Sequence, residues 1–272
     1  MNTNQPIGVI DSGLGGLSIL RHLTNDLPCE GFVYFADSIF CPYGKRNFHE
    51  IRGRAFLIVE YLLNIYNVKL VVVACNTLTA AAIDELRAKY SIPFVGMEPA
   101  IKPAALNTKT GVIGVLATEG TFNGKLFKQT QEKYASDIKV IVQAGNGLVE
   151  LIEKGITDGY DIERLLNKYL KPMKNSGVDL LALGCTHYPF LLETINKMYP
   201  DFKIIDPAPA ISKHTATVLN KHGMKNLMGT CKNPTVAHHR QIDLLTTGQA
   251  DDLQKFAKKI IHASFTTKTI TL

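Results

Sequence analysis

Two cysteines stand where apolar runs give way to small polar residues. Cys75 follows the run VVVA, and Cys185 follows the run LLALG. A short, continuous apolar run is typical of a buried strand, and open α/β sheets place their functional groups at the carboxyl ends of such strands. Two thiols that face one carbon from opposite sides can remove a proton on one face and return it on the other. The pattern therefore predicts racemisation that needs no cofactor.

Either cysteine taken alone could equally be a core residue, because free cysteine is among the most buried residue types. The residues that follow favour a functional role. Asn76 and Thr77 follow the first cysteine and Thr186 follows the second, and such side chains are suited to capping a helix. A helix N-terminus stabilises a thiolate and offers free N–H groups to a carboxylate. We expect both cysteines to precede helices and these side chains to contact the substrate.

Asp11 ends the strand-like run IGVID and is followed by a glycine-rich turn. A dinucleotide-binding fingerprint would need glycine where this chain has Ser18, and no phosphate loop is present. Asp11 is either a simple helix cap or a carboxylate that holds Cys75 or a substrate ammonium group.

Two further features could belong to the same site. Tyr43 and Gly44 follow another strand end, Phe35-Ala36-Asp37. They lie in either a surface turn or a loop whose backbone approaches a ligand closely. His187 stands two residues after Cys185, where it either exchanges protons with the thiol or serves a structural role.

Short apolar runs alternate with helix-length amphipathic segments along the whole chain. Such alternation predicts an α/β fold with doubly wound, mostly parallel sheets. The strand at Gly8 precedes Cys75 by almost the same interval as the strand at Gly114 precedes Cys185, which indicates two similar lobes. We predict a first lobe of residues 1–98 plus 210–272, a second lobe of residues 99–209, and a cleft between them with both cysteines on its walls.

Composition narrows the class of protein. With 46% hydrophobic and 20% charged residues over 272 positions, the chain is expected to fold as a globular enzyme. We expect no signal peptide and no membrane span, and hence a cytoplasmic location. The net charge of +6 is scattered, which disfavours a nucleic-acid partner and favours a small acidic substrate. No CxxC pair is present, so we expect no metal site and reduced thiols at all five cysteines, namely Cys29, Cys41, Cys75, Cys185 and Cys231.

Six segments in order carry a family resemblance: IGVIDSGLGGL, PYGKR, VVVACNT, LATEGTF, LVELIEKG and LGCTHYPFL. Together they resemble the glutamate racemases of the cofactor-independent aspartate/glutamate racemase superfamily. The resemblance implies two similar α/β lobes with glutamate held between them. It also implies an isomerase that uses no cofactor and supplies D-glutamate for bacterial peptidoglycan.

Position by position, the resemblance implies that Cys75 and Cys185 transfer the proton. Asp11 and His187 would assist them, and Glu153 would support the histidine. The implied substrate-binding residues are Asp11, Ser12, Tyr43, Gly44, Asn76, Thr77, Thr118, Thr121, Thr186 and His187.

The chain departs from the family pattern at Ala144-Gly145, at Asp206-Pro207 and in the apolar stretch 38–41 before the PYG motif. These departures concern the cleft rim and the dimer surface, so a homodimer stays open as an option. Two rival functions also stay open. One is a related racemase that acts on aspartate or a hydantoin, and the other is an amino-acid-binding protein, which would need neither thiol.

Overall fold

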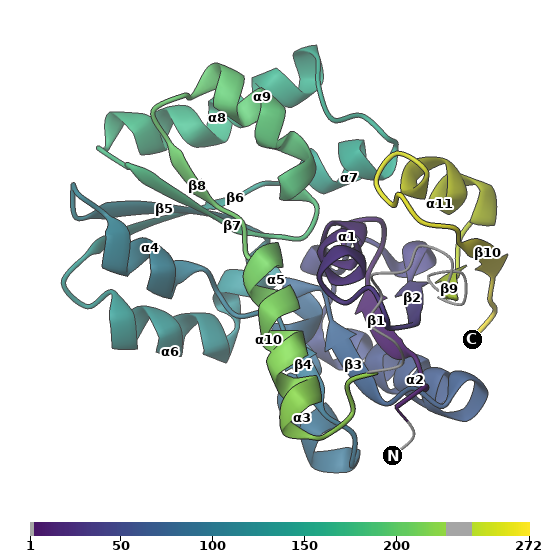
Figure 1. The fold of residues 1–272 in the computed structure, drawn as a ribbon. Helices are drawn as coiled ribbons and strands as arrows, with labels where there is room; N and C mark the ends of the chain where they lie inside the picture. The colour runs from purple at the N-terminus through teal and green to yellow at the C-terminus, as the bar shows by residue number, and fades with distance from the viewer. Residues whose placement is uncertain (1–2, 227–240) are drawn as a thin grey trace.

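The computed structural model describes residues 3–226 and 241–272, and it places two parallel sheets side by side with helices around each (Figure 1). The first sheet contains, in spatial order among the described residues, β10 (Thr266–Thr269), β9 (Ile242–Thr246), β2 (Phe32–Ala36), β1 (Ile7–Asp11), β3 (Leu70–Val73) and β4 (Phe94–Gly96). The second contains β6 (Lys139–Ala144), β5 (Val112–Ala117), β7 (Leu180–Gly184) and β8 (Lys203–Ile205).

Every strand pairing in the described part of the chain is parallel, so the predicted fold class is confirmed. In the first sheet, Asp11 pairs with Ala36, and Ile10 pairs with Val73. In the second sheet, Ala117 pairs with Gly184. The loops after β1, β2 and β3 therefore leave one edge of the first sheet together, and those after β5 and β7 leave one edge of the second.

Helices cover the faces of both sheets. Around the first sheet lie α1 (Leu17–Asp26), α2 (Phe48–Tyr66), α3 (Asn76–Lys89), α10 (Ala208–Lys221) and α11 (Ala250–Ala257). Around the second lie α4 (Ile101–Asn107), α5 (Glu119–Asn123), α6 (Lys125–Tyr134), α7 (Leu148–Glu153), α8 (Tyr160–Asn175) and α9 (Leu192–Met198). In the described ranges, the loops also contain the 3-10 segments η1 (Ser38–Phe40), η2 (Tyr43–Lys45) and η3 (Tyr188–Leu191).

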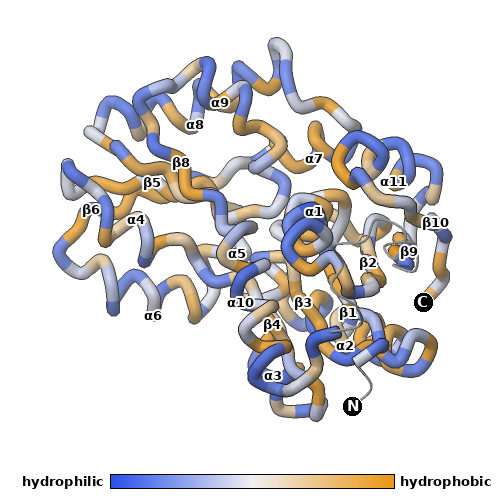
Figure 2. The backbone as a smooth tube through the Cα atoms, in the orientation of Figure 1, coloured by the Kyte–Doolittle hydropathy of each residue, from blue (hydrophilic) through white to orange (hydrophobic). Residues whose placement is uncertain are grey.

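The strands near the centre of each sheet are apolar and buried because helices cover both of their faces (Figure 2). One core cluster runs from the α1 face of the first sheet to the α8 face of the second and includes Cys185. A separate cluster fills the space between the first sheet and α2 and α3, and it includes Cys75. The two thiols are thus held by different cores.

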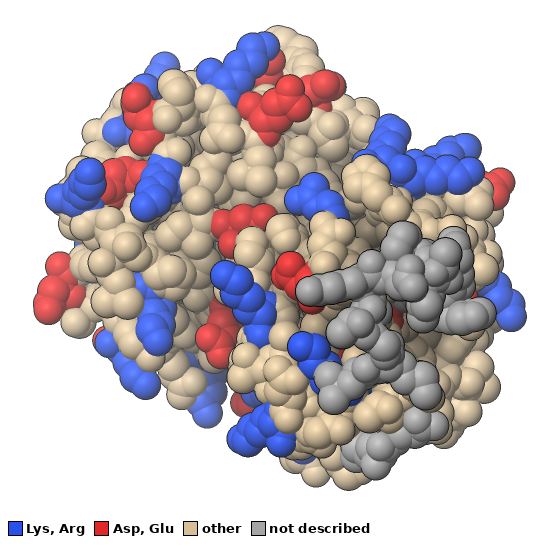
Figure 3. Space-filling model, in the orientation of Figure 1, with Lys and Arg blue, Asp and Glu red and all other residues tan. Residues whose placement is uncertain are grey.

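The division into a first lobe of residues 1–98 plus 210–272 and a second of residues 99–209 stays a prediction, which limited proteolysis would check. Helix α10 packs against α1. None of the helices in the described ranges is long and apolar enough to cross a membrane. Lys and Arg side chains are spread over the face shown in Figure 3 and interspersed with Asp and Glu.

Candidate active site

A small cavity lies between the two sheets, at the carboxyl ends of their strands. Its lining comes from the loops after β1, β2, β3, β5 and β7, together with residues of α3, α5 and α7 and the last residue of β7. The lining residues are Ser12, Pro42, Tyr43, Gly44, Cys75, Asn76, Thr77, Thr118, Thr121, Val149, Gly184, Cys185, Thr186 and His187. Of the predicted site residues, only Asp11 and Glu153 lie outside this lining, and each is hydrogen-bonded to a residue of it.

Cys75 sits at the N-cap of α3. Its Sγ accepts the backbone N–H of Leu78 at 3.5 Å and lies 3.9 Å from the Ser12 hydroxyl. The prediction that Asn76 or Thr77 caps this helix is wrong, because the cysteine itself takes the cap position and both residues lie in the first turn. Burial raises the pKa of Cys75 well above its usual value, so the thiol form is favoured.

Cys185 has a different setting. The residues after it form a turn and the 3-10 segment η3, and the α-helix α9 begins only at Leu192. The prediction of a helix directly after Cys185 is wrong because Pro189 has no N–H and disfavours the α conformation at Tyr188. The Sγ of Cys185 lies 3.7 Å from His187 Nδ1 instead.

His187 connects Cys185 to a carboxylate. Its Nε2 lies 2.5 Å from Glu153 Oε1, which also accepts the backbone N–H of Leu14 at 2.7 Å. Burial alone would lower the pKa of His187, but its hydrogen bonds to Cys185, Cys41 and Glu153 outweigh burial and raise it. Burial would likewise raise the pKa of Glu153, but the hydrogen bond with His187 helps to hold it below its usual value. An imidazolium in this position donates to both of its partners, and donation to sulfur stabilises negative charge there.

Asp11 is fully buried and joins the two lobes. Its Oδ1 accepts the Thr186 hydroxyl at 3.1 Å, and its Oδ2 accepts the Gly13 N–H at 3.0 Å. Burial raises the pKa of this carboxyl group, although nearby His187 opposes the shift. Asp11 therefore contacts the loop that carries Cys185, and its expected role beside Cys75 stays a prediction.

The glycines of the first-lobe loop let its backbone approach the second lobe. A Cβ at Gly13 would overlap with the Glu153 carboxylate, and one at Gly15 would overlap with the ring of His187. Only glycine leaves room for this contact. The glycine-rich turn does not match a dinucleotide-binding fingerprint, and its role is instead to let the two lobes come into contact.

Three hydroxyl groups from both lobes meet at another wall of the cavity. Thr77 Oγ1 lies 2.8 Å from Thr118 Oγ1, and Thr121 Oγ1 lies 2.9 Å from Thr118 Oγ1. Nearby, the Oδ1 atom of Asn76 is buried and has no hydrogen-bond partner among the described residues. A buried acceptor without a partner is costly, so this atom is available to a ligand that carries a donor.

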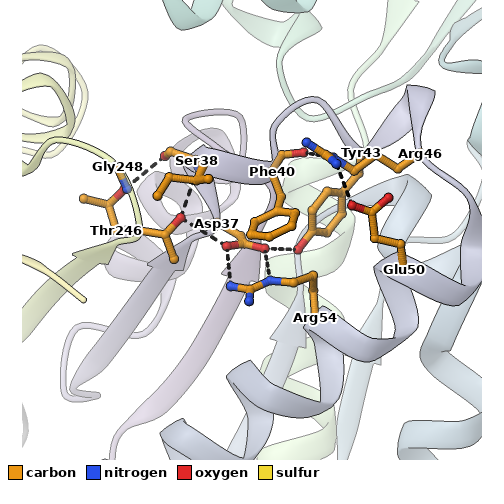
Figure 4. Close-up of polar contacts among 11 residues, drawn as sticks. Asp37, Ser38, Phe40, Tyr43, Arg46, Glu50, Arg54, Thr246 and Gly248 are labelled. Atoms are coloured by element: carbon orange, nitrogen blue, oxygen red, sulfur yellow. Dashed lines mark hydrogen bonds and ion pairs between the residues drawn. The ribbon is translucent and has the colours of Figure 1, made fainter. Parts of the chain in front are cut away.

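Tyr43 is held by a buried polar network that the sequence did not reveal (Figure 4). Its hydroxyl donates to Asp37 Oδ2 at 2.6 Å, and Arg54 binds both oxygens of the same carboxylate at 2.9 and 2.8 Å. The hydroxyl of Thr247 also donates to Asp37, at 3.1 Å. The position of Asp37 at a strand end was a usable signal, but nothing local connects it with Arg54 on α2 or with Thr247 far along the chain.

Cys41 is the other residue that sequence reasoning missed. It precedes a cis peptide bond to Pro42, and its Sγ lies within 4.8 Å of ligand atoms of Glu153 and His187. Cys41, Cys75 and Cys185 are free, whereas Cys29 is disulfide-bonded, so the prediction of reduced thiols is wrong for Cys29. That prediction rested on the lack of CxxC spacing, which carries no information on cysteines far apart in sequence. Cys231 lies outside the described residues.

Comparisons with known proteins identify the family of this chain. A family profile described as Asp/Glu/Hydantoin racemase matches residues 7–215. The glutamate racemase of Ectopseudomonas mendocina (strain ymp) is 47% identical over 225 residues, which cover 82% of this chain and 85% of that protein.

Two solved structures extend the likeness over the whole fold. Glutamate racemase isoform RacE1 from Bacillus anthracis has a TM-score of 0.87 and 30% identity, covering 100% of this chain and 99% of that one. Glutamate racemase from Francisella tularensis in complex with D-glutamate has a TM-score of 0.84 and 28% identity, covering 99% and 98%.

The fold, the cavity and these relatives define an isomerase of the two-lobed α/β type. The chain belongs to the Asp/Glu/Hydantoin racemase family. The resemblance to glutamate racemases seen in the sequence is confirmed.

Proposed function

We propose that this protein interconverts L- and D-glutamate, with Cys75 and Cys185 as the two groups that transfer the α-proton. The observation that carries the proposal is that both free thiols line one small cavity between the lobes. The glutamate racemases similar in sequence and fold support glutamate as the substrate.

In one direction a thiolate at one cysteine takes the α-proton while the other cysteine, as a thiol, protonates the opposite face. In the reverse direction the roles exchange. Cys75 starts as the protonated partner because burial disfavours its thiolate. Cys185 has a different neighbour, His187, whose Nδ1 lies 3.7 Å from its sulfur. Asp11 and Glu153 act behind this pair, on Thr186 and His187 respectively.

The remaining lining residues would bind the substrate. The free Oδ1 of Asn76 is suited to accept a hydrogen bond from the substrate ammonium group. The hydroxyls of Thr77, Thr118 and Thr121, with the N-terminal N–H groups of α3, offer donors to its carboxylates. Because the cavity is buried between the lobes, these donors act with little competition from water as negative charge develops on the substrate. Ser12, Tyr43, Gly44 and Thr186 complete the wall.

In a bacterial cell this reaction would supply D-glutamate for peptidoglycan, and the enzyme would act in the cytoplasm on a small molecule. The proposal includes no cofactor and no nucleic-acid or membrane partner. A homodimer is included as an option, which sedimentation would decide.

The test is α-proton exchange in heavy water, with L- and D-glutamate incubated separately with the purified protein and no added cofactor. NMR and circular dichroism should show deuterium at the α-carbon of the inverted product from both isomers. Exchange with aspartate or a hydantoin but not with glutamate would mean that the enzyme acts on that compound instead of glutamate. No exchange with any of these, together with normal glutamate binding, would favour an amino-acid-binding protein instead.

A further inference from the structure

One side-chain cluster beside the cavity contains a thiol, that of Cys41, which the proposed proton transfer does not use. The Sγ of Cys41, a carboxylate oxygen of Glu153 and a ring nitrogen of His187 all lie within 4.8 Å of one another. They come from three separate places, namely the loop after η1, the end of α7 and the turn after β7. A thiol, a carboxylate and an imidazole are the ligand types that Zn²⁺ takes in proteins.

We propose that Cys41, Glu153 and His187 form a binding site for a borderline-soft divalent cation such as Zn²⁺. The cluster leaves a tetrahedral ion one open position, as three-ligand zinc sites do. Glu153 already lies 2.5 Å from His187 Nε2, and this pair must separate by less than about 1 Å to admit an ion with bonds of about 2.0–2.2 Å.

The surroundings orient two of the three ligands. Glu153 Oε1 is held by the Leu14 N–H at 2.7 Å, and His187 Nδ1 faces Cys185 at 3.7 Å, which leaves Nε2 directed at the cluster. Such supporting contacts fix ligand orientation in metal sites. The Glu153 side chain is 21% exposed and Cys41 is partly exposed, so an ion can reach the cluster from outside the cavity.

Binding would have a defined chemical balance. The thiol proton of Cys41 and the Nε2 proton of His187 pass to solvent as the ion takes both electron pairs. The bound ion then fixes the protonation of the imidazole beside Cys185 and breaks its contact with Glu153. The cation would therefore act as an inhibitor, and it would do so without occupying either Cys75 or Cys185.

The first experiment titrates the metal-free protein with Co²⁺, with the Cys29 disulfide intact and Cys41, Cys75 and Cys185 free. It follows the near-ultraviolet absorption that arises from thiolate-to-cobalt charge transfer. The wild-type protein should develop this band, and Zn²⁺ should abolish it by competition. Cys41→Ser should lose the band and bind Zn²⁺ about 10-fold or more weakly. Cys75→Ser is the matched control and should keep the band. Cys41→Ala serves as the second variant, and circular dichroism checks that each variant is folded.

A band that persists in Cys41→Ser and disappears in Cys185→Ser or Cys75→Ser would place the ion on the cavity thiols and overturn the proposal. So would the lack of any band in the wild-type protein. Because this readout needs no turnover, its failure is distinct from failure of the proposed racemase activity. If the protein racemises glutamate, Zn²⁺ should inhibit the wild-type enzyme about 10-fold or more at a concentration that leaves Cys41→Ser near its own metal-free rate.

Discussion

The two walls of the cavity hold the same reactive group by different means. On the first-lobe wall, Cys75 caps a 14-residue helix and faces the N–H of Leu78 and the Ser12 hydroxyl. On the second-lobe wall, Cys185 has no α-helix directly after it and faces His187, which is paired with Glu153. Cys75 is supported by backbone dipoles and neutral donors. Cys185 is supported by the ionised pair of His187 and Glu153.

This difference gives two chemically identical groups different electrostatic surroundings. Helix N–H groups stabilise a thiolate only modestly, and burial opposes it, so Cys75 rests as a thiol. The imidazolium of His187 places a full positive charge beside Cys185. The asymmetry lies in the surroundings, so changes to those surroundings should affect the two walls differently.

The largest effect should come from the thiols themselves. Cys75→Ser and Cys185→Ser should each lower kcat for glutamate racemisation by about 10³-fold or more, because a serine hydroxyl is a far weaker acid and base than a thiol. Calorimetry should show glutamate binding that is nearly unchanged in both variants. Loss of turnover in only one variant would contradict the comparison of the two walls. It would mean that a single base serves both faces of the substrate α-carbon.

Glu153→Gln should lower kcat/KM by about 10- to 100-fold, because His187 loses the partner that favours its protonated form. L- and D-glutamate are enantiomers of equal free energy, so kcat/KM must fall equally in both directions. The individual values of kcat and KM can still differ between the L-to-D and D-to-L directions. We expect them to differ, because the variant alters the Cys185 wall alone. Glu150→Gln on the same helix, α7, is the matched control and should stay within about threefold. Equal changes of kcat in both directions would argue against a role specific to that wall.

Tyr43→Phe should lower the free energy of unfolding by about 1–2 kcal/mol, because the buried Asp37 loses one donor but keeps Arg54 and Thr247. Urea denaturation measures this change. Tyr160→Phe is the control, since that side chain is 79% exposed and should contribute almost nothing. Equal losses in the two variants would contradict a supporting role of Asp37 for the first-lobe wall.

The smallest effect on activity is expected for the exposed ion pair between Lys45 and Glu150, which lies where the two walls meet. Lys45 in η2 pairs with Glu150 in α7, and the Lys45 side chain is 62% exposed. Lys45→Gln should raise KM for glutamate by less than about threefold at low salt and not at all at high salt, because exposed charges are screened. Lys89→Gln breaks a comparably exposed pair within the first lobe and should leave KM unchanged. A large, salt-independent effect at Lys45 would mean that it contacts the substrate directly.

The sequence predicted the features that local patterns encode. Apolar runs that stop at Asp11, Cys75 and Cys185 predicted the strand ends, and parallel pairing then brings these ends to the cavity. The prediction of a helix after each cysteine was correct for Cys75 and wrong for Cys185, where Pro189 was the available signal.

Contacts between distant segments could not be predicted in this way. Glu153 was expected near His187 only through family resemblance, because nothing in its own segment distinguishes it from the neighbouring Glu150. Cys41 reaches the same cluster because of the path of its loop, and the sequence does not reveal that path. The Asp37 carboxylate accepts hydrogen bonds from Tyr43 in its own loop, from Arg54 on α2 and from Thr247 after β9.

The order of strands in the first sheet also has a consequence for how the protein is made. Strand β2 lies between β1 and β9, and β9 begins at Ile242, more than 200 residues after β2 ends at Ala36. A ribosome that adds ~5–20 residues per second would leave that edge of β2 open for roughly 10 to 40 s. During this interval the nascent chain carries an apolar strand with unpaired backbone groups, which is a template for aggregation and a target for chaperones. Residues synthesised long after β2 are thus the ones that pair with its open edge.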